Sequence, residues 1–201
     1  MNSINSTRNL VYKISQGDKR AFGELFRMYY EKFIKISLQY VRGYNNVEDI
    51  VSEVFIKILN GIDKIKTIDR VEAYLFTMVK NQCLDFLKKK NNKSLVLIDD
   101  YEDNFLVESG DLRIEIEGNE LSTVINNCIA QYPPKRKMVY RLIKEERLKY
   151  KEVAVILSIS PKTVEHHLEL ALKSLREVLE LFYKDAGVDT PIRYIQRRKN
   201  I

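Results

Sequence analysis

Apolar residues recur at three- and four-residue spacing through most of the chain, which is the period of an amphipathic α-helix. The longest stripe consists of Phe22, Leu25, Phe26, Tyr29, Phe33, Ile36 and Tyr40. We find no convincing segment in which apolar and polar residues alternate as they do in a half-buried strand. The pattern therefore predicts an all-α fold, with this aromatic stripe as part of the core.

Polar breaks divide the pattern into separate helices. Asp18 follows the break at 15–17 and is a natural N-cap for the striped helix, which we expect to end at Gly43. Asn46 is expected to cap a third helix, with Asp49 at the capping-box position. The buried face of that helix is predicted to consist of Val47, Ile50, Val51, Val54, Ile58 and Leu59.

Residues 61–69 are expected to form a loop, and a long helix is predicted from about Arg70 to Lys90. These elements complete a first helical domain at 5–92. A second helical domain is predicted at 120–182, followed by a basic tail at 183–201.

The segment at 93–119 joins the two domains and differs from both in charge. Its carboxylates outnumber its cations, and they are Asp99, Asp100, Glu102, Asp103, Glu108, Asp111, Glu115 and Glu117. We expect a flexible acidic linker, which either stays solvated or lies in a positively charged channel of a partner.

The most informative stretch is YKEVAVILSISPKTVEHHLELALKSL at 150–175, which has the layout of a helix-turn-helix. Ser160 is a good N-cap for the second helix, and Pro161 suits the first helical position. One face of that helix is apolar. The opposite face carries Lys162, Thr163, Glu165, His166, Glu169 and Lys173. Such a helix reads base edges in a major groove, so the chain is predicted to bind DNA.

The composition agrees with DNA binding and also indicates the cellular compartment. The 201 residues are 45% hydrophobic and carry a net charge of +6, which favours a polyanionic partner. Cys83 and Cys128 lie in apolar helical patterns and are expected to be buried thiols in a reducing compartment. Since no stretch has the length of a membrane span and the N-terminus lacks the apolar core of a signal peptide, we expect a cytoplasmic protein without membrane insertion.

Three further segments carry a family resemblance. QGDKRAFGELFRMYY (16–30), EDIVSEVFIKIL (48–59) and YLFTMVKNQCLDFLKKK (74–90), followed by the helix-turn-helix, resemble the sigma-70 family of RNA polymerase sigma factors. The match is to the extracytoplasmic-function (ECF) group, which has little beyond the second and fourth sigma domains. The Lys-, Ile- and Asn-rich composition and the segment ISPKTVEHHL also resemble Bacteroidetes members of this group, which are paired with iron- or glycan-uptake systems. The resemblance implies a non-enzymatic factor that directs core polymerase to particular promoters.

The resemblance places the polymerase-docking surface on the third helix. The family's D-x-V-Q-E-x-F pattern docks on the clamp helices of the largest polymerase subunit. Here its residues are Asp49, Ile50, Val51, Ser52, Glu53 and Phe55. Ser52 stands where a glutamine is usual, so one long hydrogen-bonding side chain is missing. Asp49 and Glu53 lie four apart on one helical face and suit basic groups on a partner.

The long helix resembles the part that opens and reads the minus-ten promoter element. Asn81 and Asp85 match the N-x-x-x-D spacing, Tyr74 stands where tryptophan is usual, and Thr77 where arginine is common. Opening DNA requires stacking and polar contacts to unpaired bases. The residues expected to supply these contacts are Lys66, Tyr74, Lys80, Asn81 and Lys88.

The second domain resembles the part that reads the minus-thirty-five element, through the polar face at 162–173. Arg147 and Ser158 replace glycines that are usual before and within the motif, so Ser158 must end its helix without the freedom of glycine. We expect His166 to meet DNA and His167 to lie on the flank of the helix. Adjacent residues point about 100° apart on a helix, so a shared metal site at these two histidines is not expected.

Two other classes of protein agree less well with the sequence. The stretch ISPKTVEHHL at 159–168 also resembles the output helix of LuxR-type regulators, which act without being polymerase subunits. That class needs an upstream receiver or ligand domain, and residues 1–92 show no βα alternation and no acidic phosphoacceptor cluster. No catalytic triad, zinc motif or phosphate cradle is visible, so neither an enzyme nor a cofactor is expected. The resemblance implies three partners: core RNA polymerase, promoter DNA and an anti-sigma factor.

Overall fold

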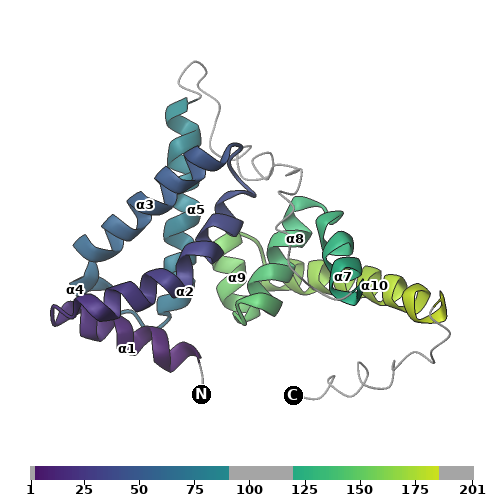
Figure 1. Cartoon of the computed structure of the whole chain (residues 1–201), viewed down its shortest axis with the longest axis horizontal. Coiled ribbons are helices and arrows are strands. Elements are labelled where there is room, and N and C mark those ends of the chain that lie inside the picture. Colours follow the sequence, from purple (N-terminus) through teal and green to yellow (C-terminus); the bar gives the residue numbers. More distant parts are fainter. Residues whose placement is uncertain (1–2, 91–119, 186–201) are drawn as a thin grey trace.

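The computed structural model describes residues 3–90 and 120–185, and every regular element within these ranges is a helix (Figure 1). The predicted all-α fold is therefore confirmed. The helices fall into an N-terminal block and a C-terminal block, separated by the segment in which the acidic linker was expected. That linker and the basic tail beyond residue 185 lie outside the described residues.

The N-terminal block contains five helices. They are α1 (Ser3–Ser15), α2 (Lys19–Ser37), α3 (Tyr44–Asn60), α4 (Ile62–Ile65) and α5 (Val71–Lys90). Asp18 caps α2 as expected, because its carboxylate accepts from the backbone N–H groups of Arg20 at 2.9 Å and Ala21 at 3.2 Å. Helices α2, α3 and α5 pack on one another, and α1 crosses below them (Figure 1).

Four local expectations were wrong. Helix α2 ends at Ser37 rather than at Gly43, and Gly43 instead precedes α3 with φ 91°, a left-handed conformation that suits glycine. The side chain of Asn46 donates to the Arg42 carbonyl at 3.1 Å, inside the first turn, so it is not the N-cap. The expected loop at 61–69 contains the short helix α4. Leu59, expected in the core, is 40% exposed.

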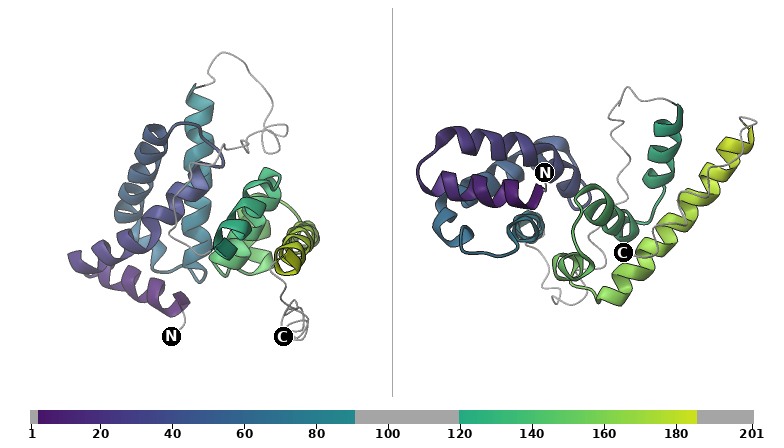
Figure 2. Two further views of the ribbon diagram at one scale, coloured as in Figure 1. Left: turned by 45° about the vertical axis from the view of Figure 1, so that its right-hand side comes forward. Right: turned by 90° about the horizontal axis from the view of Figure 1, so that it is seen from below.

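The C-terminal block is built around the helix-turn-helix. Its elements are α7 (Glu120–Ala130), α8 (Pro134–Tyr140), a π-helical turn (Arg141–Glu145), α9 (Tyr150–Leu157) and α10 (Pro161–Asp185). The predicted cap of α10 is confirmed, since the Ser160 hydroxyl accepts from the Thr163 N–H at 3.0 Å. Figure 2 shows α10 running past the rest of the block, with α7 alongside its far half.

Two residues of this block adopt the left-handed conformation without being glycine. Arg147 has φ 57° before α9, and Ser158 has φ 54° at the C-cap of α9. These are the two positions at which the sequence resemblance implies glycine. The expectation that Ser158 ends its helix at positive φ is confirmed, and the strain amounts to about 1 kcal/mol or more at each position.

The core of the N-terminal block is aromatic, as the stripe predicted. Phe33 lies at its centre, with ring centroids 5.3 Å from Tyr29, 5.4 Å from Phe55 and 5.8 Å from Phe76. Cys83 is buried beneath the same helices. A smaller cluster holds the C-terminal block together around Cys128, where the Tyr132 hydroxyl donates to the Ala171 carbonyl.

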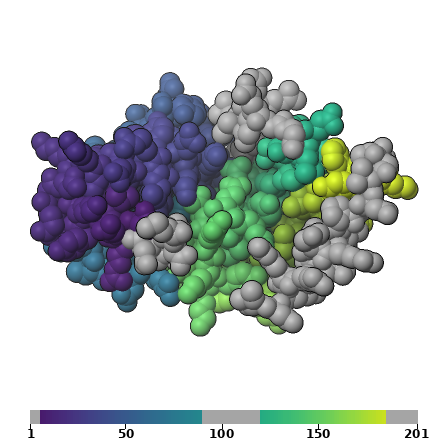
Figure 3. All heavy atoms as spheres, turned by 60° about the horizontal axis from the view of Figure 1, so that its bottom comes forward, coloured from purple at the N-terminus to yellow at the C-terminus, as the bar shows by residue number. Residues whose placement is uncertain are grey.

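The two blocks are in contact with each other. Helix α9 packs on α5, and apolar residues of both blocks belong to one continuous buried cluster. In the space-filling view the segment that includes α9, drawn in green, occupies the middle of the molecule (Figure 3). This arrangement determines which of the expected site residues are accessible.

Candidate polymerase and promoter interfaces

The outer face of α3 carries polar residues together with exposed apolar side chains, of which Ile56 is the most exposed. Asp49, Ser52 and Glu53 are exposed on it, and Ile56 beside them is 57% exposed. Ile50, Val51 and Phe55 are buried instead, which differs from the expectation that they touch a partner. They fix α3 from beneath, because the inner stripe of an amphipathic helix must pack on the core.

Gln82, on α5, links this face to the long helix. Its amide nitrogen donates to the Glu53 carboxylate, and its amide oxygen accepts from the Lys57 ammonium. Gln82 is itself buried, so this bridge fixes one carboxylate and one cation on the rim of the α3 face. The sequence pattern did not single out Gln82, since a glutamine beside Asn81 looks like an ordinary surface residue of a helix.

The exposed face of α5 brings together three of the five residues expected at the minus-ten element. Asn81 and Lys88 are exposed, and Tyr74 is half-buried and packs against the core. These residues are spaced seven apart, which places them on one side of the helix. An aromatic edge, an amide and an ammonium on one face are suited to an unpaired base and its phosphates.

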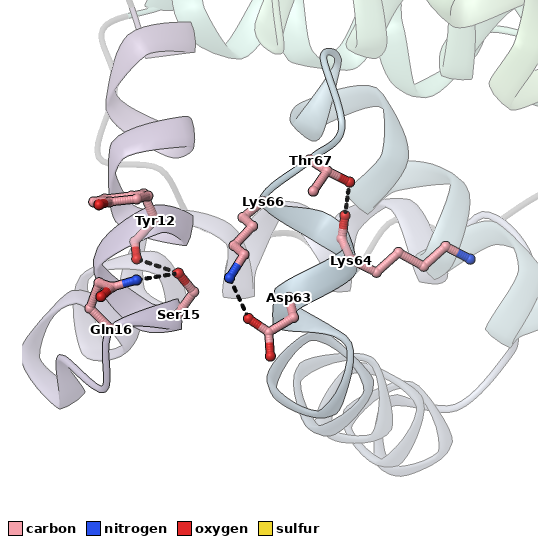
Figure 4. A network of polar contacts seen from close by, with 7 residues as sticks. All are labelled: Tyr12, Ser15, Gln16, Asp63, Lys64, Lys66 and Thr67. Atoms are coloured by element: carbon pink, nitrogen blue, oxygen red, sulfur yellow. Dashed lines mark hydrogen bonds and ion pairs between the residues drawn. The ribbon is translucent and has the colours of Figure 1, made fainter.

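Lys66 lies at the end of α4, next to α1. Its ammonium pairs with Asp63 at 2.6 Å, and the Thr67 hydroxyl donates to the Lys64 carbonyl at 2.8 Å (Figure 4). The Lys64 side chain extends away from this pair. Exposed pairs one helical turn apart contribute little free energy, so Lys66 can exchange Asp63 for a phosphate at small cost.

Lys80 is the expected minus-ten residue that the structure places elsewhere. It is only 6% exposed, and its ammonium donates to the hydroxyl of Ser158 at 2.8 Å. Ser158 belongs to the turn of the helix-turn-helix, so the C-terminal block covers Lys80. The sequence could not reveal this contact because the two residues lie 78 positions apart.

The polar face of α10 is largely accessible. Lys162, Glu165, His166, Glu169 and Lys173 are exposed along it. Thr163 is the exception, because the residue is half-buried and its hydroxyl shares a hydrogen bond of 2.8 Å with the capping hydroxyl of Ser160. Five of the six residues expected at the minus-thirty-five element therefore present side chains to solvent.

His167 lies on the flank of α10, as expected, and faces basic groups. Partial burial lowers its pKa, and the nearby charges of His166, Arg136 and Lys135 lower the pKa further. The rings of the two histidines have centroids 6.2 Å apart and are tilted by 45°. Within the described residues, no three potential metal ligands come together, and no helix has the length and apolar character needed to cross a membrane.

Comparison with known proteins decides the family. A model of sigma-70 region 2 matches residues 25–93, and a model of sigma-70 region 4 matches residues 122–175. Together these two segments cover more than half of the chain. The chain belongs to the sigma-70 family.

The curated relatives of this chain are sigma factors, and the matches cover most of their length. The chain is 26% identical over 178 residues to the ECF RNA polymerase sigma-E factor of Haemophilus influenzae, covering 85% of this chain and 92% of that protein. It is 25% identical over 146 residues to the RNA polymerase sigma factor SigV of Bacillus subtilis, covering 73% and 83%. These relatives and the paired regions 2 and 4 make this an ECF sigma factor.

Solved sigma factors share the fold. The sigma factor RpoE of Bartonella quintana, in complex with the anti-sigma factor NepR, aligns over 79% of this chain and 96% of its own at a TM-score of 0.56 and 17% identity. CnrH, in complex with the cytosolic domain of CnrY, aligns over 88% and 98% at a TM-score of 0.52 and 18% identity.

The family fixes the general function. This sigma factor is an alternative, non-enzymatic initiation factor that works with core RNA polymerase on promoter DNA. The LuxR-type alternative is not favoured, because region 2 occupies the part of the chain where such a regulator would carry its sensing domain.

Proposed function

We propose that this sigma factor docks on core polymerase through the outer face of α3, with Asp49, Ser52 and Glu53 as its polar contacts. Ile56 supplies an apolar centre to the same surface, and Ile50, Val51 and Phe55 hold the helix in position from the core side. The observation that supports this docking surface best is the exposure of Ile56 between fixed charges. Protein interfaces typically have an apolar centre that is surrounded by a polar rim.

The exposed face of α5 is proposed to read the minus-ten element. Tyr74 stacks on an unpaired base, Asn81 bonds a base edge, and Lys66 and Lys88 hold phosphates. Lys80 joins this group only when the C-terminal block has moved away, since Ser158 covers it in the present arrangement.

The exposed face of α10 is proposed to enter the major groove of the minus-thirty-five element. Lys162, His166 and Lys173 contact phosphates or base acceptors, and Glu165 and Glu169 accept from cytosine amino groups. Thr163 supports the cap at the start of the helix through Ser160. We propose that the protein acts in the bacterial cytoplasm, where its polymerase and promoters are, and that an anti-sigma factor restrains it.

Run-off transcription tests the proposal. Core polymerase, a genomic promoter library and the purified chain should give discrete transcripts that depend on the chain. Promoter-specific duplex binding without any polymerase-dependent transcript would instead support a conventional regulator.

Single substitutions separate the surfaces. Lys162→Ala should weaken binding of the holoenzyme to the minus-thirty-five duplex by about tenfold while leaving polymerase affinity unchanged, since one base contact is worth about 1–3 kcal/mol. Lys184→Ala, an equal change at the exposed far end of α10, is the matched control and should alter neither. Equal loss of DNA and polymerase binding in Lys162→Ala would refute the assignment of α10.

A further inference from the structure

Gln82 is buried on α5 and bonds to two charged side chains of α3, which packs beside α5 (Figure 1). Its amide nitrogen donates to Oε2 of Glu53, and its amide oxygen accepts from the ammonium of Lys57. Among the ion pairs of the described residues, Glu53 and Lys57 do not pair with each other. The glutamine therefore joins the two charges in place of a direct ion pair, and we call its two hydrogen bonds the amide bridge.

The spacing of these charges would by itself favour a direct ion pair. Lys57 lies four residues after Glu53, and a glutamate followed at this distance by a lysine is the favourable order for pairing on a helix. Asp49 lies four residues before Glu53, so the three side chains form one row along α3. A direct pair would tie the Glu53 carboxylate to Lys57 and reduce the negative charge that Asp49 and Glu53 present together.

A side-chain amide can satisfy both partners at once. An ionised glutamate only accepts hydrogen bonds and a lysine ammonium only donates them, whereas an amide has a donor and an acceptor. A carboxylate at position 82 would repel Glu53, an ammonium would repel Lys57, and an apolar side chain would bond to neither. The amide bridge uses only Oε2 of Glu53, so Oε1 can accept from a partner at the same time.

The burial of Gln82 gives the amide bridge a fixed direction. The glutamine is 6% exposed, and its neighbours Val79 and Cys83 on α5 are fully buried. A side chain enclosed by close-packed neighbours has few conformations, so its amide meets α3 in one orientation. The exposed side chain of Glu53 takes its orientation from this buried group. Less of its conformational freedom is then left to lose when a partner binds.

We propose that Gln82 is a positioning residue for the docking of core polymerase. It fixes the Glu53 carboxylate and keeps Lys57 from neutralising it, so that Asp49 and Glu53 together meet a basic side chain of the polymerase. Gln82 acts through Glu53 and does not touch the polymerase itself, because its side chain is buried. The inference rests on the proposed function, since it uses the assignment of the outer face of α3 to polymerase docking.

Gln82→Met tests the amide bridge with little change in shape, because methionine is also long and unbranched but has no strong donor or acceptor. Affinity for core polymerase should fall about fivefold. Ordering one long side chain on binding costs about two- to tenfold, and a competing pair with Lys57 adds about twofold at most. Competition with labelled wild-type chain for core polymerase would measure the affinity. The urea midpoint should stay within about 0.5 M of wild type, since the exposed Glu53 and Lys57 return to water.

A double-mutant cycle shows whether Gln82 acts through Glu53. Glu53→Gln should by itself weaken polymerase binding about tenfold, the usual effect of losing a charged hydrogen bond. In that background Gln82→Met should add less than about twofold, whereas two independent effects would multiply to about fiftyfold. Lys57→Gln should raise the affinity of the Gln82→Met variant about twofold and leave that of the wild-type chain unchanged. An equal gain in both backgrounds would refute the role of Lys57.

The matched control is Gln39→Met. It makes the same change at the other buried glutamine of the described residues, which has no part in the amide bridge, and it should leave polymerase affinity within about twofold of wild type.

The outcomes separate the two proposals. If neither Glu53→Gln nor Ile56→Ala weakens polymerase binding, the docking surface on α3 is refuted. If Ile56→Ala weakens binding but Gln82→Met does not, or if the double variant loses about fiftyfold, the role of Gln82 is refuted and the docking surface stands. Circular dichroism shows whether each variant is folded, and Gln82→Leu takes the place of Gln82→Met should the latter misfold.

Discussion

Phe55 and Ile56 are neighbours in sequence that the structure assigns to different tasks. Phe55 is 3% exposed, and its ring lies 4.6 Å from that of Phe26 and 5.4 Å from that of Phe33. Ile56 is 57% exposed on the proposed docking face. Substitution by alanine should therefore affect stability at one position and polymerase binding at the other.

Truncation of a buried phenylalanine to alanine costs about 3–5 kcal/mol, because it removes apolar contacts and leaves a cavity. With a urea slope of about 2 kcal/mol per molar, the unfolding midpoint of the N-terminal block should fall by about 2 M. Ile56→Ala should shift the same midpoint by less than about 0.3 M, because exposed substitutions change stability by about 0.5 kcal/mol at most.

Polymerase affinity should show the reverse order for folded protein. Ile56→Ala should weaken binding to core polymerase by about tenfold, whereas Phe55→Leu, which keeps the core apolar, should fold and bind within about threefold of wild type. Urea denaturation followed by circular dichroism and a competition assay for core polymerase would measure the two effects. A loss of less than about 1 kcal/mol in Phe55→Ala would refute the placement of its ring in the core.

Two other residues give independent tests. Arg147→Gly should stabilise the chain by about 1 kcal/mol, because glycine adopts φ 57° without strain, whereas Arg147→Ala should not; equal effects would contradict the left-handed conformation. For His167, burial and three neighbouring cations lower the pKa, so the unfolded chain binds the proton more readily. Stability should then fall as the pH drops below about 6.5, and His167→Gln should flatten this part of the profile in urea titrations at pH 7.5 and 6.0.

Local signals in the sequence predicted the elements that local chemistry determines. Asp18 and Ser160 cap their helices as expected, and the helix at 70–90 appears as α5 within one residue. The expectation for Asn46 was wrong, because Gly43, three residues before Asn46, allowed α3 to begin at Tyr44. Capping rules list the residues that can end a helix, but the neighbouring chain decides which one does.

Contacts between residues that are far apart in the sequence could not be predicted from it. The pairing of Lys32 with Glu146 spans 114 positions, and both residues read as ordinary surface charges in the sequence. Lys80 was expected on the DNA face for its charge, yet Ser158 of the other block covers it. Periodicity describes which face of a helix is apolar, but it cannot indicate which surfaces two domains bring together.

Glu152 divides its two carboxylate oxygens between two separate structures. One oxygen accepts from the Lys149 N–H at 2.7 Å and completes the first turn of α9, while the other pairs with Arg70 of the N-terminal block at 3.3 Å. Departure of Arg70 would leave the first oxygen and its helix end undisturbed. The contact that stabilises α9 and the contact that joins it to the N-terminal block therefore use different oxygen atoms of Glu152. The helix-turn-helix can separate from the N-terminal block and return to it without losing the contact that stabilises its own first turn.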